Sequence, residues 1–297
     1  MLAANFVGFT EHELGESIFQ EIEIFLKLVS FSERRRLVCY GYKGILESEI
    51  IDFYRGDISV PEENLNHSLN DVLIDIKDFD EFALKSLAVG RSCFFREHLF
   101  EAIGKAAYRE YSSLESEYLS YYSALENLVN GYRDMDKFHY VLEGENYKKF
   151  SKDLKSFIKK HNFFKDKDED EKELRSKKRQ RVYEKIAELN RISFGTAFKA
   201  FCEFYQVDLH DLWSLGGGEV ATSLTKIRNR LIHGGRFERG EYDAVICAKT
   251  HLKWTLERCI LRVLNWDIEK SKVRPSFLKH YVHYNEWEQK MSLLNNN

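Results

Sequence analysis

Residues 224–236 read Leu-Thr-Lys-Ile-Arg-Asn-Arg-Leu-Ile-His-Gly-Gly-Arg, and this stretch decides our interpretation of the fold. At about 100° per residue on an α-helix, Leu224, Ile227 and Leu231 fall on one apolar stripe, which predicts a core-facing side. Gly234 stands where helices commonly end on a residue in the left-handed conformation, so we expect the helix to stop there. The stretch therefore predicts a short amphipathic helix inside a mainly α-helical protein.

The polar side of this helix carries the candidate catalytic residues. Asn229 and His233 are four residues apart and share a face, and Arg228 lies between the apolar stripe and Asn229. An imidazole can move a proton to or from a ribose hydroxyl near neutral pH. An arginine supplies a planar cation for a phosphate and its transition-state charge. We therefore take Arg228, Asn229 and His233 as catalytic candidates.

Further basic residues surround these three. Lys226 and Arg230 are predicted to point outward, and together with Arg236 they are candidates for binding an RNA backbone through electrostatic attraction. Ordinary solvated charge is the alternative interpretation of these three cations. For the central residues, the alternative is a capped helix in which His233 bonds to a carbonyl and Arg228 pairs with an acid.

The composition sets limits on the class of protein. The chain has 297 residues, 43% of them apolar, which allows two domains with buried cores. Only two prolines occur, which favours long uninterrupted helices. Lys and Arg number 45 against 48 Asp and Glu, so a nucleic acid could only be bound by a local basic patch.

Five scattered cysteines fit free thiols in a reducing compartment. Without a secretory signal or a long apolar run, we expect a cytoplasmic protein that does not contact a membrane.

Residues 1–90 predict a small α+β region. The segment 17–29 is apolar but ambiguous between helix and strand. Residues 36–42 and Glu49–Tyr54 alternate between apolar and polar and are rich in β-branched and aromatic side chains, which predicts antiparallel strands with a turn at Lys43-Gly44. Residues 73–76 suggest another strand.

From residue 91 onward, apolar residues recur at helical spacing. We expect a helical domain over residues 91–270 and a peripheral tail over 271–297. The predicted helices cover residues 94–107, 114–131, 147–164, 182–205, 221–233 and 242–265.

Residues 165–181 hold an acidic run followed by a basic run. We interpret them as a solvated, charge-paired helix start or linker, because the neighbouring acids largely cancel the basic field. The alternative is a nucleic-acid contact made by Lys177, Lys178, Arg179 and Arg181.

Two other motifs do not predict a cofactor or a metal. Residues 216–218 are glycines, but Glu219 follows them in place of the Lys-Ser/Thr that a phosphate-binding loop requires. His280 and His283 have metal-ligand spacing, but no third ligand stands at a convincing distance in the sequence. We expect neither a cofactor nor a metal site.

The combination R-N-x-L-I-H-G, after a glycine loop and before a long closing helix, resembles the HEPN superfamily and, within it, ApeA-like proteins. The resemblance covers roughly residues 92–265. Supporting pieces are Tyr-Tyr-Ser-Ala-Leu-Glu-Asn-Leu at 121–128, Glu-Leu-Asn-Arg-Ile-Ser-Phe at 188–194 and Ile-Leu-Arg-Val-Leu at 260–264.

The resemblance implies a C-terminal HEPN-type helical bundle that acts as a metal-independent endoribonuclease of a toxin or antiphage defence system. Its substrate would be RNA, possibly tRNA, and it would work as a homodimer with two R-N-x-x-x-H helices facing each other. Arg228 would hold the phosphate, Asn229 would position it, His233 would be the acid and base, and Glu126 would lie near the site in support. A trigger or antidote protein would be a further partner. The alternative is a catalytically inactive HEPN module that binds RNA, a nucleotide or a protein.

Overall fold

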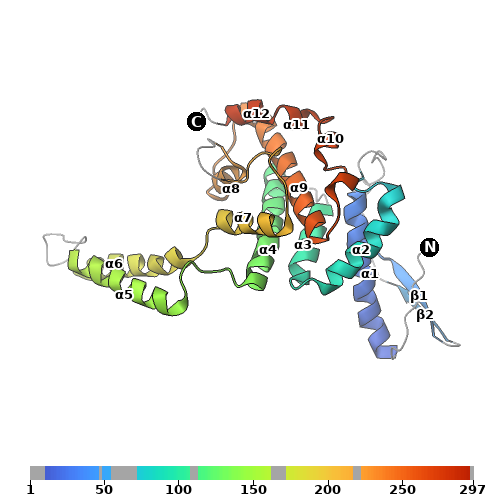
Figure 1. Cartoon of the computed structure of the whole chain (residues 1–297), viewed down its shortest axis with the longest axis horizontal. Coiled ribbons are helices and arrows are strands. Elements are labelled where there is room, and N and C mark those ends of the chain that lie inside the picture. The colour runs from blue at the N-terminus through green and yellow to red at the C-terminus, as the bar shows by residue number, and fades with distance from the viewer. Residues whose placement is uncertain are drawn as a thin grey trace. The chain divides into compact units, whose positions relative to one another are not determined.

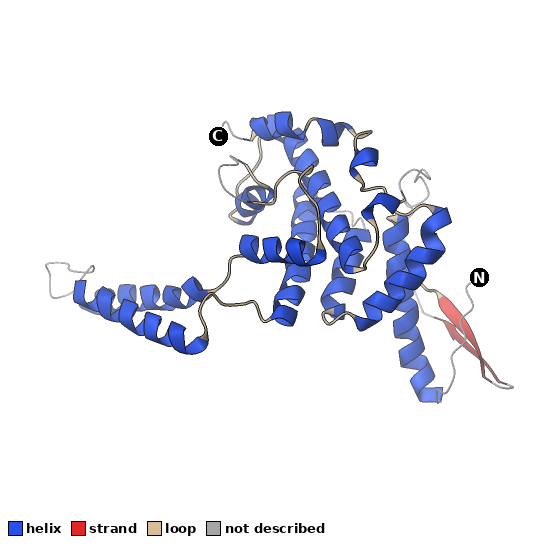
Figure 2. Cartoon of the chain, in the orientation of Figure 1, coloured by secondary structure: helices blue, strands red, loops and turns tan. Residues whose placement is uncertain are grey.

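The computed structural model describes residues 11–46, 49–54, 72–107, 113–161, 172–216 and 222–294. Most of these residues are in α-helices, and the one sheet among them has two strands (Figures 1 and 2). The mainly helical class predicted from the sequence is therefore confirmed. None of the described helices is both long enough and apolar enough to span a membrane.

The helices and strands of the described residues follow one another along the chain. The α-helices are α1 (Glu11–Glu33), α2 (Phe79–Ser92), α3 (Arg96–Ala107), α4 (Leu114–Asp136), α5 (Gly144–His161), α6 (Lys172–Ile186), α7 (Phe194–Tyr205), α8 (Leu224–Ile232), α9 (Tyr242–Val263), α10 (Pro275–Leu278), α11 (Val282–Asn285) and α12 (Trp287–Leu293). The strands are β1 (Gly41–Leu46) and β2 (Glu49–Tyr54), and short 3-10 helices are η3 (Ile76–Asp78), η5 (Ala187–Asn190), η6 (Arg239–Glu241) and η7 (Ile268–Lys270).

The chain divides into two compact units. Unit 1 comprises Met1–Tyr132 and Phe201–Asn297, and unit 2 comprises Arg133–Ala200. Helix α4 ends in unit 2, and α7 begins there and ends in unit 1. The domain boundaries expected from the sequence, at residues 90 and 270, stay a prediction.

Helix α9 is the central helix of unit 1. It is buried on several sides, which suits a helix that neighbours surround rather than one with a single apolar stripe. Helices α3, α8, α11 and α12 all pack against it. The segment expected to be a peripheral tail contributes α11 and α12 to the packing around α9, and Leu278 at the end of α10 is fully buried.

An ion pair joins the end of α1 to α9. Arg34 takes a left-handed backbone conformation (φ 51°) just after α1, and its guanidinium donates two hydrogen bonds of 2.8 and 2.6 Å to Glu257. The Glu257 side chain is fully buried. Because a buried carboxylate without a partner is strongly destabilising, Arg34 makes the N-terminal helix part of the packing of unit 1.

The N-terminal region differs from the sequence interpretation in the position of its elements. Residues 17–29 are helical, within α1, and β1 pairs antiparallel with β2 so that Gly41 faces Tyr54 and Leu46 faces Glu49. The predicted strand at residues 36–40 is wrong, because the N–H of Leu37 donates to the Ser30 hydroxyl (2.9 Å) and ties this segment to α1. Lys43-Gly44 lies inside β1 instead of at a turn.

The predicted strand at residues 73–76 is also wrong. Ile74 forms a single bridge with Ser271, the N–H of Leu73 donates to Ser32, and η3 begins already at Ile76. The segment therefore connects α1 to the chain after α9 and does not extend a sheet.

The predicted helix over residues 182–205 is interrupted. Helix α6 ends at Ile186, η5 follows, and α7 starts only at Phe194. Arg191 bridges to Tyr140, and the N–H of Ile192 donates to the carbonyl of His139 (3.0 Å). These long-range backbone bonds take the place of helical ones in the interruption.

Candidate functional site

Helix α8 presents the candidate site, and its start is fixed by a cap. The Ser223 hydroxyl accepts from the backbone N–H of Lys226 (3.3 Å), which satisfies one of the free donors at a helix start. Leu224 and Ile227 are fully buried, whereas Leu231 is only partly covered. The apolar stripe thus faces the core as predicted, most strongly in the first two turns.

The end of α8 forms a Schellman motif. The N–H of Gly235 donates to the carbonyl of Arg230 (2.8 Å), and that of Gly234 donates to Leu231 (3.1 Å). Gly234 has φ 77°, so the predicted left-handed stop is confirmed. A Cβ on Gly235 would lie 2.6 Å from Cγ of Arg230 and 2.9 Å from its carbonyl oxygen, so this position also excludes a side chain.

The three catalytic candidates lie in the second half of α8, with His233 as the residue that caps its C-terminal end. Asn229 and His233 are exposed one turn apart, and Arg228 is half-buried with its guanidinium 3.2 Å from the side-chain oxygen of Asn229. Among the described residues, the His233 imidazole has no hydrogen-bond or ion-pair partner. The structure thus joins the guanidinium to the amide, whereas His233 follows Arg228 by five residues, about 140° around the helix axis.

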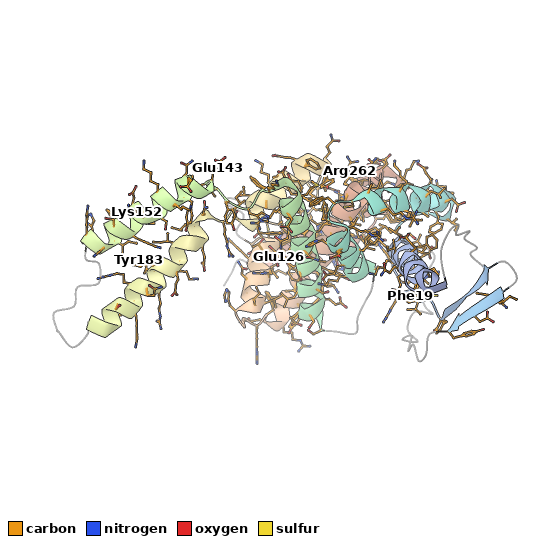
Figure 3. All side chains as sticks on the ribbon, turned by 90° about the horizontal axis from the view of Figure 1, so that it is seen from below. Phe19, Glu126, Glu143, Lys152, Tyr183 and Arg262 are labelled. Carbon is orange, nitrogen blue, oxygen red and sulfur yellow. The ribbon has the colours of Figure 1, made fainter. Side chains whose placement is uncertain are left out.

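Glu126 of α4 is the acidic partner of Arg228. The two side chains are each 30% exposed, with separations of 3.1 and 3.3 Å between the guanidinium and the carboxylate oxygens (Figure 3 labels Glu126). The guanidinium carbon also lies 5.4 Å from the centre of the Tyr122 ring. A partly exposed ion pair of this kind contributes about 1 kcal/mol or less, so a phosphate can compete for the arginine.

Two tyrosines of α4 fix the start of α8. The Tyr118 hydroxyl donates to the carbonyl of Leu224 (2.7 Å), and Tyr122 donates to the Thr225 hydroxyl (2.8 Å), which in turn donates to Leu215 (2.6 Å). Burial raises the pKa of Tyr118 well above its usual range, so this group stays a donor. The sequence analysis did not predict these hydroxyl bonds, for which two tyrosines at i and i+4 were the available signal.

Arg230 does not point outward as predicted. It donates to both carboxylate oxygens of Glu241 at 2.8 and 2.9 Å, to the carbonyl of Arg236 at 2.6 Å, and stacks over Phe237. The Glu241 side chain is only 5% exposed and needs this counter-charge. Arg230 therefore holds the turn after α8 to the start of α9.

Lys226 and Arg236, the other two substrate-binding candidates, are both exposed. Arg236 directly precedes Phe237, which is buried under the Arg230 guanidinium. Glu219 and the glycines at 217–218 lie outside the described residues.

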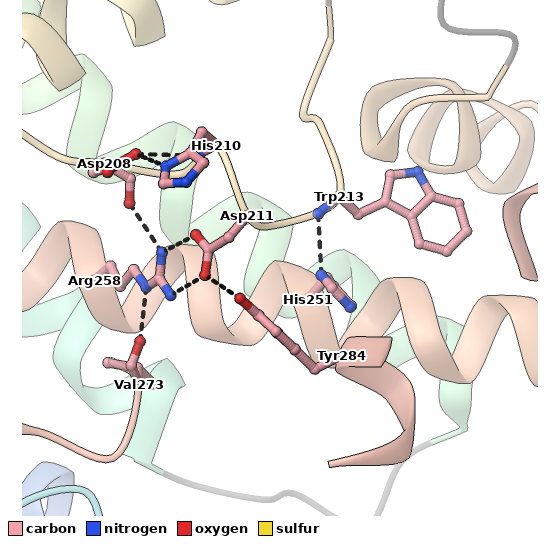
Figure 4. A network of polar contacts seen from close by, with 8 residues as sticks. All are labelled: Asp208, His210, Asp211, Trp213, His251, Arg258, Val273 and Tyr284. Atoms are coloured by element: carbon pink, nitrogen blue, oxygen red, sulfur yellow. Dashed lines mark hydrogen bonds and ion pairs between the residues drawn. The ribbon is translucent and has the colours of Figure 1, made fainter. Parts of the chain in front are cut away.

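A buried polar network beside the site could be mistaken for an active centre (Figure 4). Arg258 of α9 is 2% exposed, and its guanidinium donates to Asp211 at 2.5 and 2.8 Å and to the carbonyls of Asp208 and Val273. Tyr284 donates to the same Asp211 carboxylate (2.9 Å). Burial acts to raise the pKa of Asp211, but the hydrogen bonds and charge of Arg258 outweigh it, and the pKa lies below its usual range.

His251 in the same region is a structural histidine. Its Nδ1 accepts from the backbone N–H of Trp213 (3.0 Å), so Nε2 carries the proton and donates to the carbonyl of His283 (2.9 Å). Burial lowers the pKa of His251 to about 4. Because both ring nitrogens are occupied and the ring is fully buried, His251 cannot reach a substrate.

Within the described ranges, no three or more His, Cys, Asp or Glu side chains are grouped so that they could hold a metal ion. No protein family, curated protein or solved structure matches the chain. The resemblance to HEPN proteins over roughly residues 92–265 therefore stays a prediction from the sequence.

Proposed function

We propose that the chain is a metal-independent endoribonuclease of the cytoplasm, built as a HEPN-type helical bundle with a small N-terminal α+β region. Its site would be Arg228, Asn229 and His233. One observation carries this proposal: the His233 imidazole is exposed and free of partners within the described structure, one turn from the amide that contacts the Arg228 guanidinium. Toxin or antiphage defence is the corresponding biological role.

The proposed reaction is an internal transesterification. A neutral His233 removes the proton from a ribose 2′-hydroxyl, whose oxygen attacks the adjacent phosphorus and forms the 2′,3′-cyclic phosphate. The bond to the 5′-oxygen breaks, and a protonated imidazole returns a proton to that leaving oxygen. Arg228 stabilises the negative charge that gathers on the phosphate oxygens, and Asn229 orients the phosphate.

Because each chain offers one such imidazole, we propose that a homodimer supplies the base from one copy and the acid from the other. A dimer would have twice the 35.2 kDa mass of the chain in sedimentation equilibrium. RNA, possibly tRNA, is the proposed substrate, and a trigger or antidote protein is a proposed further partner.

The test is incubation of the full chain with total cellular RNA in EDTA, beside His233→Ala and, as a matched control, His280→Ala. His280 is also exposed but lies between α10 and α11. We expect cleavage by the parent and by the control, products that end in 2′,3′-cyclic phosphate, and a loss of at least about 100-fold for His233→Ala. Equal cleavage by all three proteins, or cleavage only after a metal is added, would remove the proposal.

A second candidate is a catalytically inactive HEPN module that binds RNA, a nucleotide or a protein. The ion pair between Arg228 and Glu126 favours it, because the cation is already neutralised. Glu126→Gln separates the two candidates. In an enzyme the freed Arg228 binds the phosphate more readily, and cleavage is kept or increased; an inactive module gains affinity for RNA and still does not cut it.

A further inference from the structure

Two helices of unit 2 concentrate positive charge in a chain that is acidic as a whole. Residues 144–186 hold 15 Lys or Arg against 9 Asp or Glu, a formal charge of +6, whereas the whole chain carries −3. Within this stretch, α5 has six lysines and two acids, and α6 has seven basic residues and two acids. We name α5 and α6 together the basic hairpin.

The basic hairpin is a defined structure and not merely a charged linker. The Tyr147 hydroxyl of α5 donates to the carbonyl of Ile186 at the end of α6 (2.9 Å), and Tyr183 of α6 donates to the carbonyl of Lys155 (3.4 Å). Nζ of Lys155 lies 5.8 Å from the centre of the Tyr183 ring. The two helices therefore lie side by side, as Figures 1 and 3 also show.

Backbone pairing closes the base of the basic hairpin. The amide side chain of Asn190 accepts from the N–H of Leu142 (2.8 Å) and donates to the carbonyl of the same residue (3.1 Å), while its own backbone carbonyl accepts from Val141. Asn190 is 6% exposed. This buried amide fixes the segment before α5 against the segment after α6, so the two helices start from a common point.

The lysines of α5 form one exposed row. At about 100° per residue, Lys148, Lys152, Lys155 and Lys159 fall within about 60° of each other and extend over about 16 Å along the axis. All four are exposed, and Figure 3 labels Lys152. Tyr147, Leu154 and Ile158, about 90–130° around the axis from this row, are partly covered, whereas Phe150 and Phe157 are 41% and 49% exposed. Part of the apolar side of α5 thus belongs to the hairpin, and the lysine row is left to the solvent.

Acidic side chains are few within α5 itself, where Glu145 and Asp153 stand against six lysines. Glu145 pairs with Lys148, but both side chains are largely exposed, so a phosphate can compete for this lysine. Most of the acidic run that was expected to cancel the basic charge, residues 166–171, lies outside the described residues.

We propose that the basic hairpin binds the phosphate backbone of RNA, with the lysine row of α5 as its main contact. Lysines spaced along one exposed helix face meet the repeating charge of a nucleic acid without reading its sequence. The identity of the partner as RNA rests on the proposed nuclease function. An anionic membrane fits less well, because α6 carries seven basic residues and is too polar along its length to insert an apolar side, although α5 exposes part of Phe150 and Phe157.

The test measures binding by the full chain in a His233→Ala background with EDTA, so that no cleavage interferes. Fluorescence anisotropy follows labelled unfractionated tRNA between 50 and 200 mM salt. The test variant replaces Lys148, Lys152, Lys155 and Lys159 by Gln, and the control replaces four exposed lysines of unit 1 by Gln: Lys43, Lys77, Lys85 and Lys279. Both variants change the charge by the same amount.

We expect the test variant to lower the slope of log K against log salt by about 3 to 4, because each lost phosphate contact removes about 0.7 to 0.9. Affinity at 100 mM salt should fall at least about 10-fold, with less than about 2-fold for the control. Equal losses in both variants, or no loss in the test variant, would overturn the proposal, as would hairpin-dependent binding to vesicles with anionic lipid but not to tRNA. Circular dichroism checks that the helices are kept.

The two proposals can fail separately. Hairpin-dependent tRNA binding without any cleavage by the parent protein would leave the basic hairpin as an RNA-binding element and remove the nuclease. Cleavage that depends on His233 but not on the four lysines would support the nuclease and remove the basic hairpin as an RNA-binding element.

Discussion

Helices α5 and α9 are long and rich in charged residues, but they use charge in opposite ways. Helix α9 buries Glu257 and Arg258, each held by a bidentate partner, Arg34 and Asp211 respectively. Helix α5 has no buried residue, and its six lysines all face solvent. A buried charge must be matched by fixed partners, whereas an exposed charge contributes little to stability and remains available for a ligand. The comparison separates the charges that stabilise the fold from those that are available to bind a ligand.

The largest expected effect comes from the buried charge of α9. Arg258→Met should destabilise the protein by about 3–5 kcal/mol, because it leaves the Asp211 carboxylate, 10% exposed, without its guanidinium. Urea denaturation measures the change. The double variant Arg258→Met/Asp211→Asn should recover part of the loss, since it removes the unpaired charge as well. A loss below about 1 kcal/mol for the single variant would show that the network does not stabilise unit 1.

The next effect is the pH dependence that His251 contributes. Its pKa is about 4 in the folded protein, against about 6.5 for an unperturbed histidine, so between these values the unfolded chain binds the proton and the folded one does not. The contribution of the neutral His251 ring to the free energy of unfolding is therefore fully present above pH 6.5. About 3 kcal/mol of it is lost as the pH drops to 4. NMR titration of the imidazole, assigned with His251→Phe, measures the pKa. Titration near 6.5 would contradict the buried, neutral ring.

A smaller effect distinguishes two glycines. Gly234→Ala at the end of α8 should cost about 1 kcal/mol, because φ is 77° and only glycine adopts that conformation without strain. Gly144→Ala at the start of α5 meets open space and should leave stability unchanged or raise it by about 0.5 kcal/mol. Thermal unfolding of the two variants compares their stabilities. An equal change in both would show that the left-handed conformation of Gly234 does not require glycine.

The smallest effect is expected on the surface of α5. Lys148 and Glu145 form an ion pair of 2.7 Å with side chains 74% and 87% exposed. Lys148→Gln should change the free energy of unfolding by less than about 0.5 kcal/mol, because solvent screens such a pair. A loss above about 1 kcal/mol in urea denaturation would show that the lysine row serves the fold, which would weaken its assignment as a binding surface.

The sequence predicted the elements that depend on local patterns. The closing helix, expected over residues 242–265, is α9 at Tyr242–Val263, and the stop after His233 occurs at Gly234 as expected. Helical periodicity and a glycine in the left-handed position act within a few residues of each other. They can therefore be read from one sequence.

Long-range partners could not be predicted in the same way. Arg230 lies away from the apolar stripe of α8, so the helical pattern placed it in solvent, but the chain turns at Gly235 and returns Glu241 to it. Arg258 meets Asp211, which is 47 residues distant in sequence. Glu126 contacts Arg228 across 102 residues, and only the family resemblance suggested that it would lie near the site. No local pattern encodes such pairs.

The bond between Arg34 and Glu257 limits how the protein can be shortened for study. A fragment that starts near residue 91 would keep every candidate site residue, but it would lack α1 and α2, which pack against α3. Its α9 would also retain a carboxylate in the interior with no guanidinium to meet it. Deletion experiments on the first ninety residues would therefore report on the integrity of the fold before they report on any regulatory role of that region.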